Sequence, residues 1–89
     1  DLDILTVICD DDIPAATLEK TIRKYAGDIL EKVVLFDVYK GVPIPADKKS
    51  VAFTLTLRAN DHTLTLEECD KSISDVIAGL EKLGALIRS

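Results

Sequence analysis

The sequence has few of the features from which enzymes build catalytic centres. Its 89 residues include one histidine, His62, and no nucleophile stands at a spacing that would pair with it. No glycine-rich phosphate-binding loop occurs either. His62 lies in the turn-like stretch Asn60-Asp61-His62, and we interpret it as a surface residue rather than a general base. The sequence therefore predicts no catalytic residues.

Cysteine is also scarce, and metal-binding motifs are missing. Cys9 and Cys69 are sixty residues apart with no C-x-x-C motif, so neither a zinc site nor a redox motif is indicated. Both fall on apolar faces of predicted elements, where a thiol packs as a small hydrophobic group, and a disulfide is the less favoured alternative. The acidic run from Asp10 to Asp12 marks a strand end and a helix start, where negative charge is favourable. We predict no metal site.

Long apolar runs and a signal sequence are absent. No run approaches the roughly 18 residues of a membrane span, and we see no secretory signal, so we expect a soluble chain with no membrane partner. The length allows a single hydrophobic core. Because the first residues already have a strand pattern, residues 1–89 are expected to form one domain cut from a longer chain.

Basic residues are fewer than acidic ones, 11 against 16. The formal net charge is -5, which argues against autonomous binding to nucleic acid, since phosphates are bound largely by lysine and arginine. The segment from Lys40 to Arg58 differs, because it holds four basic residues and one acid, a local balance of +3. A small basic region on an acidic domain fits a contact made within a larger assembly.

Hydrophobic periodicity predicts six elements in the order strand, helix, strand, strand, helix, strand. Pro14 suits the first residue of the first helix, and Thr65 with Glu68 forms a capping-box pattern at the second, which ends at Gly84. The predicted strands are 3–9, 29–39, 50–59 and 85–87, and the first helix is 14–26. With right-handed crossovers this order gives the ferredoxin-like βαββαβ fold, an α+β class with a four-stranded antiparallel sheet and two helices on one face.

One face of this sheet is left open, and alternation along the strands predicts its side chains. The stretch Val33 to Gly41 (V-V-L-F-D-V-Y-K-G) is central, because its aspartate and tyrosine are not required for core packing. To the core face we assign Val34, Phe36 and Val38. To the open face we assign Thr6, Leu35, Asp37, Tyr39, Ser50, Ala52, Thr54 and Thr56.

A carboxylate beside an aromatic ring suits recognition of a planar polar ligand such as a nucleobase. Asp37 and Tyr39 point the same way and Ser50 begins the next strand, so the three groups can converge at one end of the sheet. The basic loop places three lysines beside them to meet phosphate, namely Lys40, Lys48 and Lys49. A strand-favouring tyrosine and a solvated carboxylate are an equally acceptable interpretation.

These segments resemble one known family. L-F-D-V-Y-K-G at 35–41, I-P at 44–45, K-K-S-V-A at 48–52 and D-x-T-L-T at 61–65 are similar, in this order, to the ferredoxin-fold anticodon-binding domain at the C-terminus of the bacterial phenylalanyl-tRNA synthetase beta chain. The combination is specific, and the resemblance covers nearly the whole chain. One departure is that Asp3-Ile4 replaces the family's usual Arg-Asp pair, which leaves that arginine's contact without a counterpart.

The resemblance implies that the open face binds the anticodon stem-loop of phenylalanine tRNA. In the family the motif's tyrosine stacks on the first anticodon base while the aspartate and serine contact its edge, and these roles fall on Tyr39, Asp37 and Ser50. Thr6 falls where the family has a small residue beside the same base. The predicted RNA-binding residues are therefore Asp37, Tyr39, Ser50, Thr6, Lys40, Lys48, Lys49 and Ala52.

The resemblance also implies a parent enzyme, phenylalanine-tRNA ligase, that uses ATP and magnesium in a cytoplasmic assembly of two alpha and two beta chains. The domain itself is expected to be non-catalytic and to need no cofactor. Two other functions stay open. Amino-acid-sensing ACT-like modules share this order of elements, although a glycine-bearing turn is expected where this chain has Asp10-Asp11-Asp12-Ile13-Pro14. A protein–protein interaction module is the other.

Overall fold

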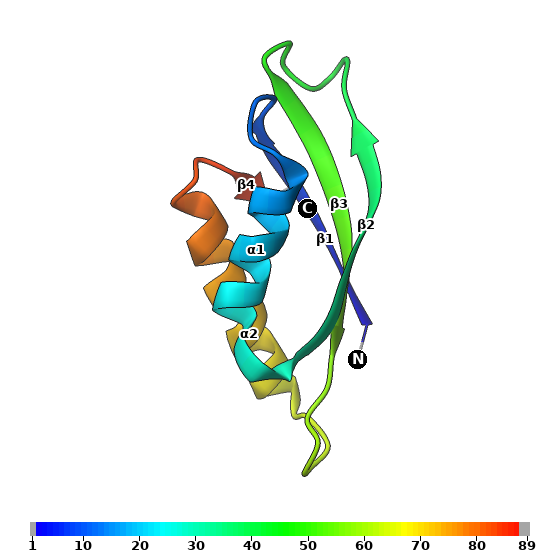
Figure 1. Ribbon diagram of the computed structural model, residues 1–89, viewed down its shortest axis with the longest axis vertical. Coiled ribbons are helices and arrows are strands. Elements are labelled where there is room, and N and C mark those ends of the chain that lie inside the picture. Colours follow the sequence, from blue (N-terminus) through cyan, green and yellow to red (C-terminus); the bar gives the residue numbers. More distant parts are fainter. Residues whose placement is uncertain (1, 88–89) are drawn as a thin grey trace.

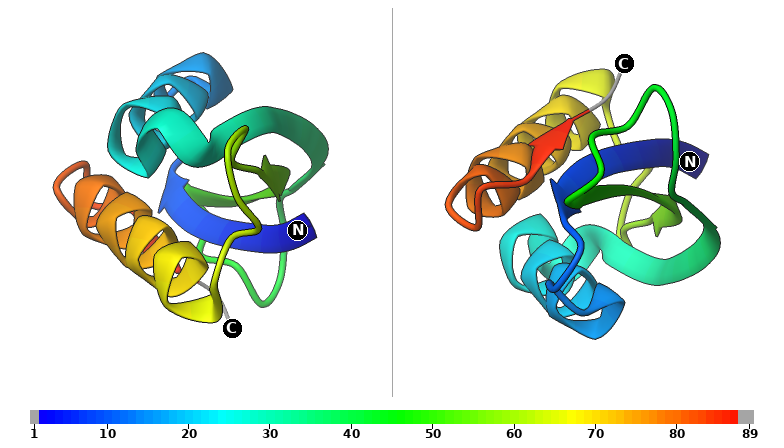
Figure 2. Two further views of the ribbon diagram at one scale, coloured as in Figure 1. Left: turned by 90° about the horizontal axis from the view of Figure 1, so that it is seen from below. Right: turned by 90° about the horizontal axis from the view of Figure 1, so that it is seen from above.

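The computed structural model describes residues 2–87 and has the predicted order of elements (Figure 1). The strands are β1 (Leu2–Asp10), β2 (Leu30–Tyr39), β3 (Lys48–Leu57) and β4 (Leu86–Ile87); the helices are α1 (Ala15–Ala26) and α2 (Leu66–Glu81), with a short 3-10 helix, η1 (Gly27–Ile29), before β2. The sheet has the order β2-β3-β1-β4 with antiparallel neighbours, and both helices lie on one of its faces (Figure 2). The predicted ferredoxin-like α+β fold is confirmed.

Regular alternation in β1 and β3 builds the core beneath the helices. Alternation in the sequence predicts four core residues in β3, and all four are at most 1% exposed: Val51, Phe53, Leu55 and Leu57. In β1 the predicted core residues Leu5, Val7 and Cys9 are also buried. These strands pack against both helices, and burying an aliphatic or phenylalanine side chain stabilises the fold by roughly 1.5–3 kcal/mol.

The helices begin and end at local signals. Pro14 is the cap before α1, with an extended ψ of 143°, rather than the first helical residue that we predicted. At α2 the capping box is confirmed: the Thr65 hydroxyl accepts from the Glu68 amide at 3.1 Å, and the Glu68 carboxylate accepts from the Thr65 amide at 3.0 Å. Gly79 allows the helices to approach closely, because a Cβ there would lie 2.3 Å from the Tyr25 ring.

Helical spacing in the sequence predicts a buried stripe on α2, which is largely confirmed; its predicted members are Leu66, Cys69, Ile73, Val76, Ile77, Leu80 and Leu83. Cys69, Val76 and Leu80 are buried, and Ile73 and Ile77 are partly buried. Leu83 is also partly buried but follows the helix, which ends at Glu81 and not at Gly84 as predicted. Leu66 was assigned to the stripe wrongly: it is the first helical residue, lies beyond the buried part and is 77% exposed. Cys9 and Cys69 are buried thiols, as we favoured, and burial raises the pKa of the Cys9 thiol.

Strand β3 is shifted from the predicted range. It begins at Lys48, two residues early, because Lys48 and Lys49 pair with Asp10 and Cys9 of β1. It ends at Leu57 instead of residue 59. Strand β2 begins one residue later than predicted because η1 precedes it.

The prediction for the two faces of β2 was only partly right, because a β-bulge interrupts the alternation. Asp37 and Tyr39 lie on the open face as predicted, whereas the residues before them do not follow the predicted assignment. Leu35 pairs with Phe53 and Asp37 with Ala52, so Phe36 is an extra residue without a partner of its own. Before the bulge, Leu35 therefore shares the helix side with Phe53 and does not lie with Asp37 on the open face. The supposed core residues are 40%, 53% and 49% exposed, in the order Val34, Phe36 and Val38.

Within residues 2–87, no helix combines the length and the apolar composition that crossing a membrane requires.

Candidate nucleic-acid interface

A hollow of about 470 Å³ lies on the open face of the sheet, beside the β2–β3 loop. Its lining residues are Thr6, Phe36, Asp37, Tyr39, Pro43, Ser50 and Ala52. Five of the eight predicted RNA-binding residues are therefore brought together. The three predicted lysines are not among the lining residues.

The strand register explains why these side chains meet. Thr6 lies opposite Ala52, which in turn lies opposite Asp37, so the three form one row across β1, β3 and β2. Tyr39 lies opposite Ser50 in the next row of the same face. Side chains on one face in adjacent rows are direct neighbours, which makes this hollow a consequence of sheet pairing.

The floor of the hollow is formed by small side chains. Ser50 and Ala52 of the central strand β3 are only 6% and 8% exposed although they lie on the open face. Larger groups stand around them, and Tyr39 is 45% exposed. A floor of small side chains beside a half-exposed aromatic ring leaves room for a planar group to stack on the ring.

The loop after β2 holds Tyr39 in position. The Tyr39 hydroxyl donates a hydrogen bond to the Val42 carbonyl at 2.8 Å. The chain turns back there at Gly41, whose φ of +115° is a conformation that other residues rarely adopt. The ring is thus oriented by its own loop before any ligand is bound, which lowers the entropy lost on binding.

Two residues of the hollow were missed by sequence analysis. Phe36 reaches the open face only because of the bulge, and strict alternation had placed it in the core. Pro43 comes from the connection between β2 and β3, which was predicted as a loop but without a path over the sheet. No local pattern distinguishes either position.

The three lysines are placed differently from each other. Lys40 Nζ lies 2.8 Å from an Asp11 carboxylate oxygen, and Lys48 forms an ion pair with Asp10, its cross-strand partner. The hydrogen bond from Lys40 holds the pKa of Asp11 below its usual value, and the bond to Asp10 raises the pKa of Lys48. Lys49 pairs with the buried Cys9, so it lies on the helix side of the sheet and away from the hollow.

The aspartates of the β1–α1 turn line a second hollow together with Asp47. Their backbone is tied to the β2–β3 loop, because the Asp11 amide donates to the Asp47 carbonyl at 2.9 Å. Across residues 2–87 there is no group of three or more histidine, cysteine or acidic side chains that could hold a metal ion.

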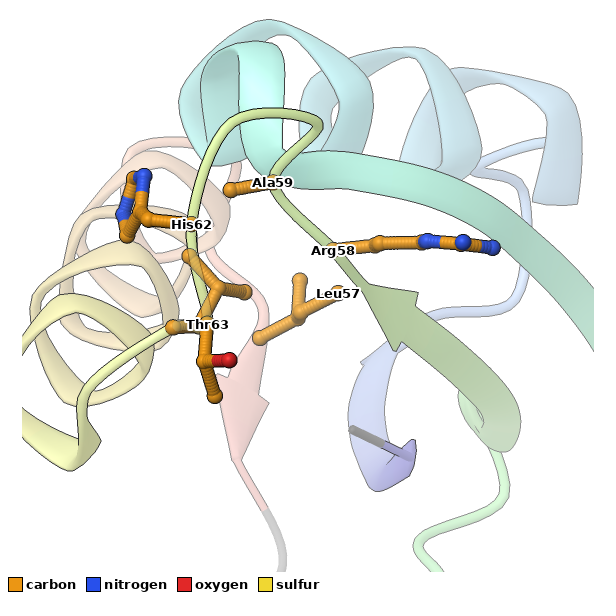
Figure 3. A pocket seen from close by; sticks show the side chains of 6 residues that line it. Leu57, Arg58, Ala59, His62 and Thr63 are labelled. Atoms are coloured by element: carbon orange, nitrogen blue, oxygen red, sulfur yellow. The ribbon is translucent and has the colours of Figure 1, made fainter.

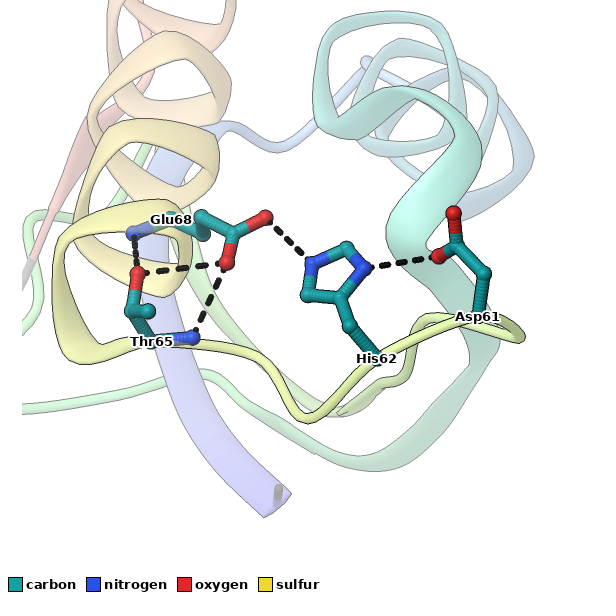
Figure 4. A network of polar contacts seen from close by, with 4 residues as sticks. All are labelled: Asp61, His62, Thr65 and Glu68. Carbon is teal, nitrogen blue, oxygen red and sulfur yellow. Dashed lines mark hydrogen bonds and ion pairs between the residues drawn. The ribbon is translucent and has the colours of Figure 1, made fainter.

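His62 belongs to a surface network at the opposite end of the domain, in the β3–α2 turn (Figure 1). Its two ring nitrogens lie 2.7 Å from an Asp61 oxygen and 2.8 Å from a Glu68 oxygen, and Glu68 also caps α2 through Thr65 (Figure 4). The bond to Glu68, and then that to Asp61, raises the pKa of His62. His62 thus lies in a surface turn, where its ring links the turn to the capping residue of α2.

A third hollow follows the end of β3 (Figure 3). Leu57 and Thr63 border it, whereas Arg58 extends away from it towards β2 and reaches Glu31 at 3.7 Å. The other titratable residue of the lining, His62, is held in the network described above. These contacts stabilise the turn and do not assemble a reactive group.

Comparison of the sequence with known proteins identifies the family of this chain. The model of the ferredoxin-fold anticodon binding domain matches residues 3–88. The chain is similar to the phenylalanine–tRNA ligase beta subunits of Corynebacterium diphtheriae, at 42% identity over 96% of this chain, and of Thermobifida fusca, at 44% identity over 94%. It spans about a tenth of the length of these relatives, 10% in both cases. The chain therefore belongs to the family of ferredoxin-fold anticodon-binding domains.

Proposed function

We propose that this domain binds the anticodon stem-loop of phenylalanine tRNA through the hollow on the open face of its sheet. The observation that carries the proposal is that Asp37 and Tyr39 line one hollow with Ser50, which forms its shallow floor together with Ala52. The names of the relatives, phenylalanine–tRNA ligase beta subunits, indicate which RNA to test.

Each group has a chemical role towards one nucleobase. The oriented Tyr39 ring offers a stacking surface, and stacking on an aromatic side chain is worth roughly 1–3 kcal/mol per base. The Asp37 carboxylate accepts hydrogen bonds from N–H groups on the base edge, and the Ser50 hydroxyl both donates and accepts. Thr6 and Ala52 are small enough to let the base approach the sheet.

Phosphate contacts are the weaker part of the interface. Lys40 and Lys48 stand near the hollow but are bonded to Asp11 and Asp10, so a phosphate must replace a carboxylate at each ammonium group. With a net charge of -5 the domain gains little from long-range attraction to RNA. Binding should be weak and sensitive to salt, with a slope of about 0.7 per phosphate neutralised.

In the parent protein, we propose that the domain supports aminoacylation by holding the tRNA at its anticodon. The parent would be a cytoplasmic ligase that uses ATP and magnesium, with alpha and beta subunits in an alpha2beta2 assembly. The domain contributes binding and no chemistry. The amino-acid-sensing alternative is not favoured, because the β1–α1 turn contains two aspartates, Asp11 and Asp12, and no glycine.

Titration of the 89-residue chain with the anticodon stem-loop tests the proposal. Tyr39→Ala should weaken binding by about five- to 150-fold, the range expected for loss of one stacked base. Tyr39→Phe keeps the ring and loses only the bond to Val42, so its loss should be much smaller. A stem-loop with the same stem and an altered anticodon serves as the control RNA. If the unsubstituted chain and the Tyr39→Ala variant bind the stem-loop with equal affinity, the proposal is contradicted.

A further inference from the structure

The bulge in β2 gives the open face a second aromatic ring. Phe36 is the unpaired residue of the bulge, lines the same hollow as Asp37 and Tyr39, and is 53% exposed. We propose that Phe36 is a second stacking platform, which takes a base next to the one that stacks on Tyr39. This inference rests on the proposed function and adds a base subsite to it.

The position of Phe36 is not explained by the stability of the domain. Without the bulge, alternation would place its ring on the face opposite to Asp37, and a phenylalanine left half in water loses much of its hydrophobic contribution. Bulges occur frequently next to functional sites, where they redirect a side chain. Here the redirected side chain is an aromatic ring at the edge of the candidate interface.

The separation of the two residues along the chain favours two bases over one. Phe36 and Tyr39 are three residues apart in β2, at most about 10 Å of regular strand and less across a bulge, and Asp37 lies between them in the sequence. A base stacked on Tyr39 with its edge at Asp37 and Ser50 leaves the Phe36 ring available to a neighbouring nucleotide. Sheet-based RNA-binding modules use aromatic residues in this way to stack two or three successive bases.

Phe36 has no hydrogen-bonding group, so its contribution should depend on the presence of a base and not on its identity. Phe36 is 53% exposed in the hollow, so its side chain is accessible to a base. The two platforms would therefore differ in kind. Tyr39 works beside edge-reading groups, whereas Phe36 adds affinity without specificity.

A double-mutant cycle between protein and RNA tests this assignment. The RNAs are the intact stem-loop and three versions with one abasic site, at the first anticodon position, the preceding position or the following position. Phe36→Ala should weaken binding to the intact RNA by about five- to 150-fold. That loss should disappear on the RNA that lacks one of the two neighbouring bases, and it should persist on the RNA that lacks the first anticodon base.

Two further variants control for indirect effects. Val38→Ala removes a similarly exposed apolar side chain, 49% against 53%, from the opposite face of the same strand, and should leave every affinity unchanged. Phe36→Leu keeps an apolar side chain but removes the ring, so it should lose binding much as Phe36→Ala does. Thermal unfolding of each variant shows whether the fold is intact.

The outcomes separate the two proposals. An equal loss on all four RNAs, no loss on any, or a loss that vanishes only with the first anticodon base would overturn the Phe36 assignment. If Tyr39→Ala weakens binding while Phe36→Ala does not, the proposed function stands and the second platform falls. If the unsubstituted 89-residue chain does not bind the intact stem-loop, the proposed function and the Phe36 assignment are both overturned.

Discussion

Two aromatic residues on the open face are exposed for different physical reasons. Tyr39 lies opposite Ser50, on the face that regular alternation predicts, and the hydrogen bond from its hydroxyl to the Val42 carbonyl holds it in position. Phe36 owes its position to an inserted residue in the strand. The first could be predicted from the sequence, because a period of two is local information. The second could not, because a bulge depends on how β2 pairs with β3.

A residue-scale prediction concerns the pH dependence of stability. Hydrogen bonds to Glu68 and Asp61 raise the pKa of His62 above its usual 6.5, so the stability contributed by the protonated ring is complete below pH 6.5 and is lost as pH rises through the raised value. The hydrogen bond from His62 lowers the pKa of Asp61 from 3.8, and the Thr65 amide, followed by His62, lowers the pKa of Glu68 from 4.5, so the carboxylates' contribution is lost only in stronger acid. The network should stabilise most between about pH 5 and 6.5.

His62→Gln removes the charge and keeps a polar side chain. The loss of unfolding free energy relative to the unsubstituted chain should therefore be larger at about pH 5.5 than at about pH 8. Urea unfolding midpoints at the two pH values provide the measurement. A deficit of the same size at both would show that the protonated ring does not act through these carboxylates.

At the scale of elements, the local signals in helices and strands could be predicted from the sequence, whereas the ion pairs between different elements could not. The capping box of α2 and the core faces of β1 and β3 follow from residues within a few positions of each other. The ion pair between Lys48 and Asp10 depends instead on the register of β3 against β1. The pair between Lys40 and Asp11 depends on the β1–α1 turn lying beside the end of β2. Sequence alone therefore predicted free lysines where the structure has paired ones.

These two pairs lead to a prediction about RNA affinity. The double variant with Asp10→Asn and Asp11→Asn releases Lys40 and Lys48 for phosphate, so affinity for the stem-loop should rise, by about two- to ten-fold, with a steeper salt dependence. Titrations at several salt concentrations measure both quantities.

A matched control for this prediction is the double variant with Asp28→Asn and Asp70→Asn. It raises the net charge by the same two units, but neither aspartate belongs to the open-face hollow. A similar gain in the control would indicate a general charge effect. No gain in the Asp10 and Asp11 variant would mean that these aspartates do not compete with RNA.

For the molecule as a whole, the division between two sheet faces organises both stability and function. Both helices cover one face of the sheet (Figure 2), and the hydrophobic core lies beneath them. The open face carries a hollow whose small and polar residues lie beside two aromatic rings, Phe36 and Tyr39. An acidic domain with a shallow hollow and partly neutralised lysines suits a contact that works alongside others.

The most direct test of the central claim is an NMR titration of the ¹⁵N-labelled chain with the anticodon stem-loop. Our account predicts that the largest shifts fall on the backbone amides around the hollow, at Thr6, Asp37, Tyr39, Ser50 and Ala52. The amides of α1 and α2, on the other side of the sheet, should change little. Shifts concentrated on the helices, or none at saturating RNA, would contradict binding through the open face.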